Sequence, residues 1–312
     1  MTIASIDIGT NTALLLIAEV DSFTRKLIPL RNEYRMPRIG EGTKQTGFIS
    51  QNKLNLLYDV LNEYKSIINS YKCDKVILTG TNAFRMAQNT TEIKDEVKKL
   101  FNYDLNVISG EEEAEYAYVG AISNLDSPDN SMVIDIGGSS TEIIYGEVYK
   151  IIFKRSLQLG SVTATEQFLK HSPPTLVELE NFSTDIKKLF STFDKTIVTK
   201  KVISIAGTAT TIACMKLELK EFVEQKVDRS SITIHDMRNI MKELSSLTTT
   251  EILDKYGAVM NGREDIIFAG AFILYQFMEH FRINNTIVST RGIRYGAIVK
   301  YLESSTKDLY SE

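Results

Sequence analysis

The sequence has little of what disulfide frameworks, zinc sites and proline-rich linkers require. It contains 2 cysteines, 5 prolines, 3 histidines and no tryptophan among 312 residues. Cys73 and Cys214 lie far apart and in no C-x-x-C arrangement, so a disulfide framework or a thiolate zinc site has little support. Because His171, His235 and His280 are isolated from one another, the sequence does not indicate histidine-based catalysis or a histidine metal site.

Long apolar runs and a basic excess are also missing. No stretch reaches the roughly 18 apolar residues of a membrane span, and the chain opens into Ile3–Ile8 without the basic region and cleavage site of a secretion signal. The net charge of −4 does not suit bulk nucleic-acid binding, which needs a basic face to replace counterions. These absences predict a cytoplasmic protein that binds neither membrane nor nucleic acid and holds any anionic ligand at a locally basic site.

Two nucleotide-binding motifs are absent as well. The sequence contains no G-x-x-x-x-G-K-[ST] and no G-x-G-x-x-G after its first apolar strand pattern, which excludes a P-loop enzyme and gives no support to a dinucleotide site. With 43% hydrophobic and 24% charged residues, the chain is nevertheless ordinary globular material. Its length suits two domains better than one or three.

Strand and helix patterns alternate along the chain, which indicates an α/β fold. Apolar runs predict strands at Ile3–Ile8, Ala13–Val20 and Leu27–Tyr34, and a helix follows Ser50. A polar break at residues 127–130 places the domain boundary, so we predict one α/β domain over residues 1–126 and a second over 127–312. We expect the second to carry a helical insertion at residues 236–256 and the last helix, from Ile293, to be free to pack back on the first domain.

The second half repeats the plan of the first. Ile6-Asp-Ile-Gly-Thr matches Ile134-Asp-Ile-Gly-Gly, and Thr79-Gly-Thr-Asn-Ala matches Ala206-Gly-Thr-Ala-Thr. Asp7 precedes Gly80 by 73 residues, and Asp135 precedes Gly207 by 72. Two matches at nearly the same offset predict an internal duplication.

The repeated Asp-Ile-Gly turn is the strongest chemical signal. A strand that ends in this way and turns straight back presents backbone N–H groups, and glycines permit the close approach of a phosphate. One such turn alone would best be read as a tight hairpin. Two copies at corresponding positions, each with an Asp where the strand ends, indicate a site for a phosphate chain or its metal, and carboxylates suit Mg²⁺.

Other charged residues support this chemistry only in combination. Glu111, Glu112 and Glu113 begin a helix, where carboxylates are favoured in any case, and at most one or two of the three can face a cleft. Glu142 lies on the strand after the second turn, where a lone Glu is more often surface decoration. Arg85 and Arg263 could neutralise phosphate oxygens or form ordinary salt bridges.

Taken together, these motifs resemble the exopolyphosphatase/guanosine pentaphosphate phosphatase (Ppx/GppA) family over nearly the whole chain. The segments that carry the resemblance occur in family order: Ala4-Ser-Ile-Asp-Ile-Gly-Thr-Asn-Thr, Arg38-Ile-Gly-Glu-Gly, Ile108-Ser-Gly-Glu-Glu-Glu-Ala, Val133-Ile-Asp-Ile-Gly-Gly-Ser-Ser-Thr-Glu, Leu159-Gly-Ser-Val, Ala206-Gly-Thr-Ala-Thr-Thr, Gly262-Arg-Glu-Asp and residues 289–296. The resemblance implies an α/β fold of duplicated actin-like ATPase (ribonuclease H-like) domains flanking an active-site cleft, and relatives imply a homodimer.

The resemblance also implies roles for individual residues. Glu113 would be the general base that activates the attacking water, while Asp135, Glu142 and Asp7 would hold Mg²⁺. Arg85 and Arg263 would clamp phosphates. The phosphate path would be lined by Asp7, Gly9, Thr10, Asn11, Gly137, Gly138, Ser139, Ser140, Gly207 and Thr208.

Four positions depart from the family pattern. Ser139 stands where a third glycine is usual, which would cost about 1 kcal/mol if that residue needed a left-handed conformation. Thr290 and Tyr295 replace acidic residues, and Asn261 replaces a proline. The chain also stops soon after residues 289–296, without the additional helical region of longer members, so we expect short polyphosphate to be favoured over very long chains.

The leading hypothesis from the sequence is a Mg²⁺-dependent exopolyphosphatase, a phosphoric anhydride hydrolase that releases orthophosphate from inorganic polyphosphate. The runner-up is a phosphohydrolase that acts on pppGpp. A third hypothesis is a non-catalytic nucleotide-binding regulatory module, although a pure binder has no need of Glu113 as a water-activating base. A phosphotransferase stays open because fold does not fix function.

Overall fold

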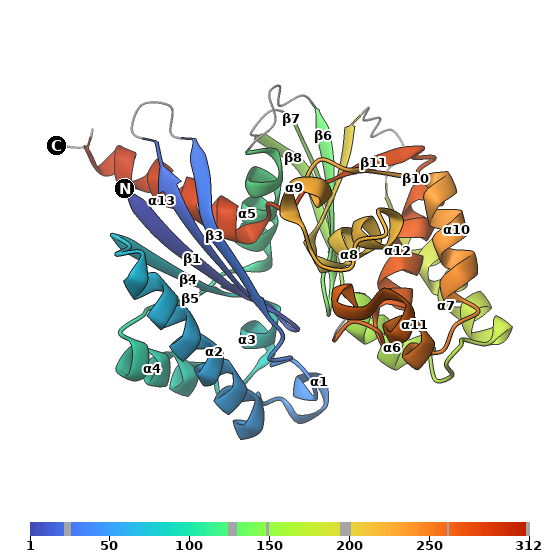
Figure 1. Cartoon of the computed structure of the whole chain (residues 1–312), viewed down its shortest axis with the longest axis horizontal. Coiled ribbons are helices and arrows are strands. Elements are labelled where there is room, and N and C mark those ends of the chain that lie inside the picture. Colours follow the sequence, from blue (N-terminus) through green and yellow to red (C-terminus); the bar gives the residue numbers. More distant parts are fainter. Residues whose placement is uncertain (22–25, 124–129, 148–149, 194–200, 261, 310–312) are drawn as a thin grey trace. The chain divides into compact units, whose positions relative to one another are not determined.

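The chain forms two compact units in the computed structural model (Figure 1), which describes residues 1–21, 26–123, 130–147, 150–193, 201–260 and 262–309. Unit 1 comprises Met1–Ser123 together with Gly292–Glu312, and unit 2 comprises Asn124–Arg291. The predicted domain boundary between residues 126 and 127 and the departure at Asn261 lie outside the described residues.

Unit 1 is built on a five-stranded sheet of order β3-β2-β1-β4-β5. Its strands are β1 (Thr2–Ile8), β2 (Ala13–Val20), β3 (Leu27–Arg35), β4 (Lys75–Gly80) and β5 (Leu105–Val107). The first three strands run antiparallel to their neighbours, whereas β4 pairs parallel with both β1 and β5. Strand β1 is therefore the central strand, and it is fully buried beyond its first residue.

Helices cover both faces of this sheet because β1 is apolar on both sides. The helices of unit 1 are α1 (Thr43–Thr46), α2 (Gln51–Ser70), α3 (Asn82–Met86), α4 (Thr90–Phe101), α5 (Gly110–Ile122) and α13 (Ile293–Leu309). Ala4, Ile6 and Ile8 pack against the apolar faces of α2 and α4. Ile3 packs on the other face with Ile298 of α13, which also lies against α5 (Figure 1).

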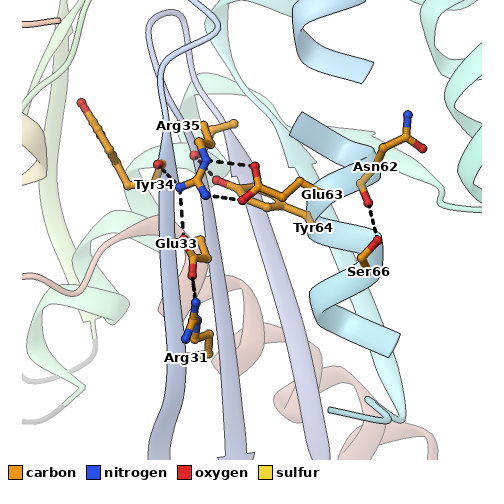
Figure 2. Close-up of polar contacts among 9 residues, drawn as sticks. Arg31, Glu33, Tyr34, Arg35, Asn62, Glu63, Tyr64 and Ser66 are labelled. Atoms are coloured by element: carbon orange, nitrogen blue, oxygen red, sulfur yellow. Dashed lines mark hydrogen bonds and ion pairs between the residues drawn. The ribbon is translucent and has the colours of Figure 1, made fainter. Parts of the chain in front are cut away.

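Charged side chains join the edge strand β3 to α2. Figure 2 shows Glu33 of β3 between Arg31 and Arg35, and Arg35 reaching Glu63 of α2. The neighbouring Tyr64 is fully buried, and its hydroxyl donates to the carbonyl of Ala13 at 2.7 Å. A row of charges on an edge strand disfavours pairing with another chain, so this network also protects the open edge of the sheet.

Unit 2 is built on a six-stranded sheet of order β10-β11-β9-β6-β7-β8. Its strands are β6 (Ser131–Ile136), β7 (Thr141–Glu147), β8 (Lys150–Leu157), β9 (Lys201–Ile205), β10 (Ser231–Thr233) and β11 (Asn285–Val288). Strands β6, β7 and β8 are antiparallel neighbours, and β9 pairs parallel with β6 and with β11. Read from β8, five of these strands repeat the order and directions of unit 1, which confirms the predicted duplication.

The helices of unit 2 enclose a single apolar core. They are α6 (Ser161–Phe168), α7 (Leu176–Phe190), α8 (Ala206–Lys216), α9 (Glu224–Val227), α10 (Ile234–Leu244), α11 (Thr249–Tyr256) and α12 (Ile267–His280), with a short 3-10 turn at Gly257–Val259. Ile134 and Ile136 of β6 contribute to this core together with aromatic rings from α7 and α12, such as Phe182 and Phe272, whose centroids lie 4.9 Å apart. The core lies within unit 2 alone.

Two expectations about helix starts need correction. The late helix was predicted from Arg263, but α12 begins at Ile267, and residues 262–266 form turns. Ser50 occupies the N-cap position of α2 as expected, but its side chain makes no capping hydrogen bond. Apolar periodicity located both helices, whereas their first turns depended on local hydrogen bonds that periodicity does not report.

The described helices were also compared with the requirements of a membrane crossing. None of them combines the necessary length with sufficient apolar character.

Candidate active site

The two predicted phosphate turns occupy corresponding places at the ends of the central strands. Asp7 lies one residue before the end of β1, and Asp135 lies one residue before the end of β6; each is 8% exposed. Each turn is closed in the same way, with Gly9 N–H donating to Thr12 at 2.8 Å and Gly137 N–H donating to Ser140 at 3.0 Å. The repeated sequence therefore produces a repeated backbone geometry.

The carbonyl side of each turn is held by a second segment that contains glycine. Gly40 N–H donates to the carbonyl of Thr10 at 2.9 Å, and Ser161 N–H, at the start of α6, donates to the carbonyl of Gly137 at 2.9 Å. A Cβ atom at Gly40 would lie 2.2 Å from Thr10 Cγ2, and one at Gly160 would lie 2.6 Å from the Gly137 carbonyl oxygen. Glycine is required at both positions because the backbones approach so closely.

Ser139 does not carry the strain that a missing glycine would suggest. The non-glycine residues of the described chain with positive φ are Arg38, Lys72, Asn102, Ala206, Glu218, Arg229 and Arg282. Ser139 is not among them, so its conformation suits any L-residue and replacing the usual glycine has no left-handed cost.

The three consecutive glutamates at the start of α5 point to different surroundings. Ser109 caps the helix in a capping box, in which Glu112 Oε2 accepts from Ser109 N–H at 2.9 Å and Ser109 Oγ accepts from Glu112 N–H at 3.1 Å. Glu111 is exposed, whereas the side chain of Glu113 is only 12% exposed. Helical geometry thus directs Glu113 inward and leaves Glu112 to stabilise the helix end.

Glu113 is paired with Arg85, another predicted site residue. Arg85 Nη1 lies 2.6 Å from Glu113 Oε2, and the same nitrogen donates to the carbonyl of Ile108 at 2.9 Å. Burial raises the pKa of the Glu113 carboxyl above its ordinary value, and Arg85 opposes part of that rise. The sequence patterns could not distinguish a phosphate clamp from a salt bridge at Arg85, and this structure holds it in the salt bridge.

Asp7 is the second buried carboxylate of unit 1. Burial, with a smaller contribution from the negative charge of Glu113, raises the pKa of Asp7 to about 7, and the positive charge of Arg294 opposes the rise. Asp7 Oδ1 has no hydrogen-bond partner within the described part of the chain. Asp7, Glu113 and Arg85 therefore form one electrostatically coupled group in unit 1.

Asp135 and Glu142 lie side by side in unit 2. They are directly opposite in the antiparallel register of β6 and β7, so they share a face, and Glu142 is only 5% exposed. Glu142 Oε1 accepts a hydrogen bond from Ser156 Oγ of β8 at 2.6 Å. The alternative of Glu142 as a surface residue is therefore wrong.

The carboxylate pair fits a hard divalent cation. Two adjacent buried carboxylates repel each other unless a positive charge balances them, and oxygen ligands suit Mg²⁺. Among the described residues there is no group of three or more His, Cys, Asp or Glu side chains suited to a metal. A cation held by Asp135 and Glu142 would need water or substrate oxygens to complete its shell, which is the usual way proteins bind Mg²⁺.

Gly207, Thr208 and Arg263 also come together in unit 2. A Cβ atom at Gly207 would lie 2.0 Å from Arg263 Nη1, so the guanidinium packs directly on the glycine at the start of α8. Thr208 Oγ1 donates to the carbonyl of Ile136 at 3.3 Å, as Thr81 Oγ1 donates to Ile8 at 3.4 Å in unit 1. A helix start beside a guanidinium is a suitable place for an anion.

The structure adds three residues near the site that the sequence patterns did not single out. Ser156 binds Glu142, Arg294 acts electrostatically on Asp7, and Gly160 permits the close approach of the second turn. Ser156 could have been found from the hairpin register, because it follows Glu142 by one turn of antiparallel pairing. Arg294 gave a weaker signal, a charge beside the apolar positions Ala297 and Ile298 of the last helix.

Thr290 replaces a usual acidic residue, and its surroundings explain why a neutral side chain suits that position. Its hydroxyl lies 3.0 Å from Glu224 Oε1 and 3.2 Å from Asp228 Oδ1, and its N–H donates to Asp228 at 2.9 Å. An acidic side chain would face two carboxylates, whereas a hydroxyl donates a hydrogen bond to them.

The predicted site residues thus fall into one set in each unit. Asp7, Gly9, Thr10, Asn11, Arg85 and Glu113 belong to unit 1, whereas Asp135, Gly137, Gly138, Ser139, Ser140, Glu142, Gly207, Thr208 and Arg263 belong to unit 2. Their assigned roles, and a cleft that would unite the two sets, stay predictions.

Comparison with known proteins gives a consistent family. A family model described as the Ppx/GppA phosphatase family matches residues 16–305. Exopolyphosphatase 2 of Mycobacterium tuberculosis is 26% identical, with 90% of this chain and 91% of that protein covered. The guanosine-5'-triphosphate,3'-diphosphate pyrophosphatase of Pseudoalteromonas translucida is also 26% identical, with 96% of this chain and 59% of that protein covered.

A longer relative and two solved structures complete the comparison. The bifunctional 3-dehydroquinate synthase/phosphatase of Fusobacterium nucleatum is 29% identical over 96% of this chain, which spans 46% of that protein, or about half its length. The crystal structure of the Aquifex aeolicus Ppx/GppA family member is 29% identical, covers 98% of each chain and has a TM-score of 0.84. An exopolyphosphatase structure from Cytophaga hutchinsonii is 27% identical over 97% of this chain and 98% of its own, with a TM-score of 0.88.

Proposed function

The chain belongs to the Ppx/GppA phosphatase family, and from that premise we propose that it is a Mg²⁺-dependent exopolyphosphatase that releases orthophosphate from the end of inorganic polyphosphate. The observation that carries the proposal is the placement of Glu113. It is the one of three consecutive glutamates with a largely buried side chain beside an arginine, on a helix start that Ser109 and Glu112 cap. A carboxylate whose pKa burial raises is suited to accept a proton from water.

In this mechanism Glu113 orients the attacking water and accepts its proton as the new P–O bond forms. The oxygen of the shortened chain leaves with the electrons of the broken P–O bond. Arg85 and Arg263 neutralise phosphate oxygens, and the backbone N–H groups of the two Asp-Ile-Gly turns fix the phosphate chain. Asp135 and Glu142 would hold Mg²⁺, with Asp7 as a further ligand, and the bound ion would neutralise charge on the transferred phosphoryl group. Positioning and charge neutralisation are what phosphoryl transfer chiefly requires.

A second candidate substrate is pppGpp. The exopolyphosphatase relative and the guanosine-5'-triphosphate,3'-diphosphate pyrophosphatase relative are both 26% identical to this chain, so identity does not favour either substrate. Both reactions break a terminal phosphoanhydride bond, and the same residues would serve either one. Cytoplasmic location and a homodimer stay predictions.

The test is phosphate release with Mg²⁺ from tripolyphosphate, long polyphosphate, pppGpp and ATP. We expect release from tripolyphosphate, its loss on chelation of Mg²⁺, and a decrease of about 10²- to 10⁴-fold in Glu113→Gln, the usual contribution of a general base. Glu112→Gln is the matched control, because it removes the neighbouring charge but keeps a residue that can complete the capping box.

The outcomes separate the hypotheses. Preference for pppGpp would promote the second substrate, and undiminished turnover in Glu113→Gln would remove Glu113 as the base. Binding without release from any substrate would favour the regulatory module.

A further inference from the structure

Arg85 makes two kinds of contact in unit 1. Its Nη1 lies 2.6 Å from Glu113 Oε2 and donates to the carbonyl of Ile108 at 2.9 Å, and its Nη2 approaches Asn82 Oδ1 at 3.4 Å. The guanidinium is thus directed at the carboxylate to which we assign water activation. The phosphate-clamping role of Arg85 needs the same guanidinium to face a phosphate oxygen.

The two roles conflict as long as the ion pair persists. A carboxylate that is paired with a guanidinium is a weaker base than the same carboxylate without it, because the positive charge stabilises the ionised form. Glu113 shows this opposition, since burial raises its pKa while Arg85 lowers it. Moving Arg85 away would leave Glu113 buried, with Asp7 as a repelling neighbour, and therefore more basic.

We propose that Arg85 is a latch on Glu113 that substrate phosphate releases: phosphate oxygens take the guanidinium away from Glu113, and the same event frees the base. This inference rests on the proposed function and adds the order of events at the site. It couples base activation to phosphate binding, so the water would not be activated before a phosphate occupies the site.

The two partners differ in how firmly the fold holds them, and that difference determines which one moves. Arg85 lies on the five-residue helix α3, and its side chain is 26% exposed. Glu113 lies on the 13-residue helix α5, which has a capping box at its start and a direct backbone contact at Gly120, where a Cβ atom would meet Gly292 O at 2.1 Å. The long arginine side chain can turn outward while the glutamate stays in place.

The test is calorimetric binding of imidodiphosphate, in which an NH group replaces the hydrolysable bridging oxygen, with Mg²⁺ present. The proteins are the wild type, Glu113→Gln, Arg85→Gln and the double variant. The latch predicts that Glu113→Gln binds about tenfold more tightly than the wild type, because Arg85 is no longer held, and that the gain largely disappears in the Arg85→Gln background. Glu112→Gln, which removes a neighbouring charge of the same helix, should bind like the wild type.

A charge-retaining variant separates the latch from simple electrostatics. Glu113→Asp keeps the negative charge but withdraws the carboxylate by one methylene, so the latch predicts tighter binding in this variant too. It also gives a second result if Glu113→Gln does not fold. An equal gain from Glu113→Gln with and without Arg85, or no gain in Glu113→Asp, would overturn the latch and leave the proposed function intact. Absence of binding in all the proteins would overturn both.

Discussion

At the scale of single residues, the candidate site of unit 1 depends on two carboxylates in surroundings that disfavour their charge. Asp7 is 8% exposed, and the side chain of Glu113 is 12% exposed. Burial raises the pKa of both, to about 7 for Asp7. A protein gains no stability from such groups, so their presence indicates that charge at these positions serves binding or catalysis.

The raised pKa of Asp7 predicts how stability depends on pH. The folded protein keeps a proton on Asp7 up to about pH 7, whereas the unfolded chain releases it near its ordinary value of 3.8. Because the folded state binds the extra proton in this window, stability falls as pH rises from about 4 to about 7. Asp7→Asn should therefore raise the free energy of unfolding at pH 8 by an amount on the order of 1 to 4 kcal/mol, and change it little at pH 4.

Urea denaturation at the two pH values, with EDTA present to keep metal out, measures this effect. Asp95→Asn is a suitable control for the general loss of a negative charge, because Asp95 is exposed on α4. A loss of stability in Asp7→Asn at pH 8 would mean that the ionised carboxylate is stabilised by its surroundings.

At the scale of elements, two helices of unit 1 cross with their backbones in contact. A Cβ atom at Gly120 of α5 would lie 2.1 Å from Gly292 O, and one at Gly296 of α13 would lie 1.9 Å from Tyr116 O. Glycine is needed at both positions because no side chain fits between the helices. The crossing holds α5, and with it Glu113, against the last helix of the chain.

This crossing predicts a large effect of one added methyl group. Gly120→Ala should destabilise the protein by at least about 2 kcal/mol, since the helices must separate to admit the Cβ atom. Gly110→Ala is the matched control on the same helix, because a Cβ atom there meets nothing within 4 Å, and alanine is the better helix former. Urea denaturation of the two variants checks the difference. Equal stabilities would show that the helices can move apart at little cost.

At the scale of the whole molecule, the chain returns to its first unit at the end. Residues 292–309 of α13 belong with residues 1–123, and the fully buried Tyr295 and Ile298 pack with Ile3 and Leu16 of the first sheet. Unit 2 has an apolar core that needs none of these residues. The stability of unit 1 therefore depends on a segment that follows unit 2 in the sequence.

Truncation after Arg291 should affect the two units unequally. Unit 1 loses the helix that covers the Ile3 face of its sheet, so its backbone amides should exchange with deuterium much faster, whereas those of unit 2 should keep most of their protection. Hydrogen exchange followed by mass spectrometry of peptides from residues 1–123 and 130–291 measures both. Equal loss of protection in the two units would contradict the assignment of α13 to unit 1.

Much of this architecture could be predicted because its signals are local. Apolar runs located β1, β2 and β4, and the repeated Asp-Ile-Gly turns revealed the duplication before any contact was known. The short elements α1, α9 and β10 were missed, because three or four residues carry too little periodicity to be recognised. The start of α12 was placed four residues early, since an apolar pattern does not show where turns give way to a helix.

The sequence by itself determined the fold class, the duplication and the family, because each depends on residue types at regular spacings along the chain. Only the tertiary structure decided which glutamate of three faces inward, that Glu142 is buried beside Asp135, and that Arg85 rests on Glu113. It also showed that Arg263 packs on Gly207 and that Ser139 is unstrained. The physical reason is that burial, pairing and pKa arise from neighbours that are distant in the chain, and a linear pattern carries no record of them.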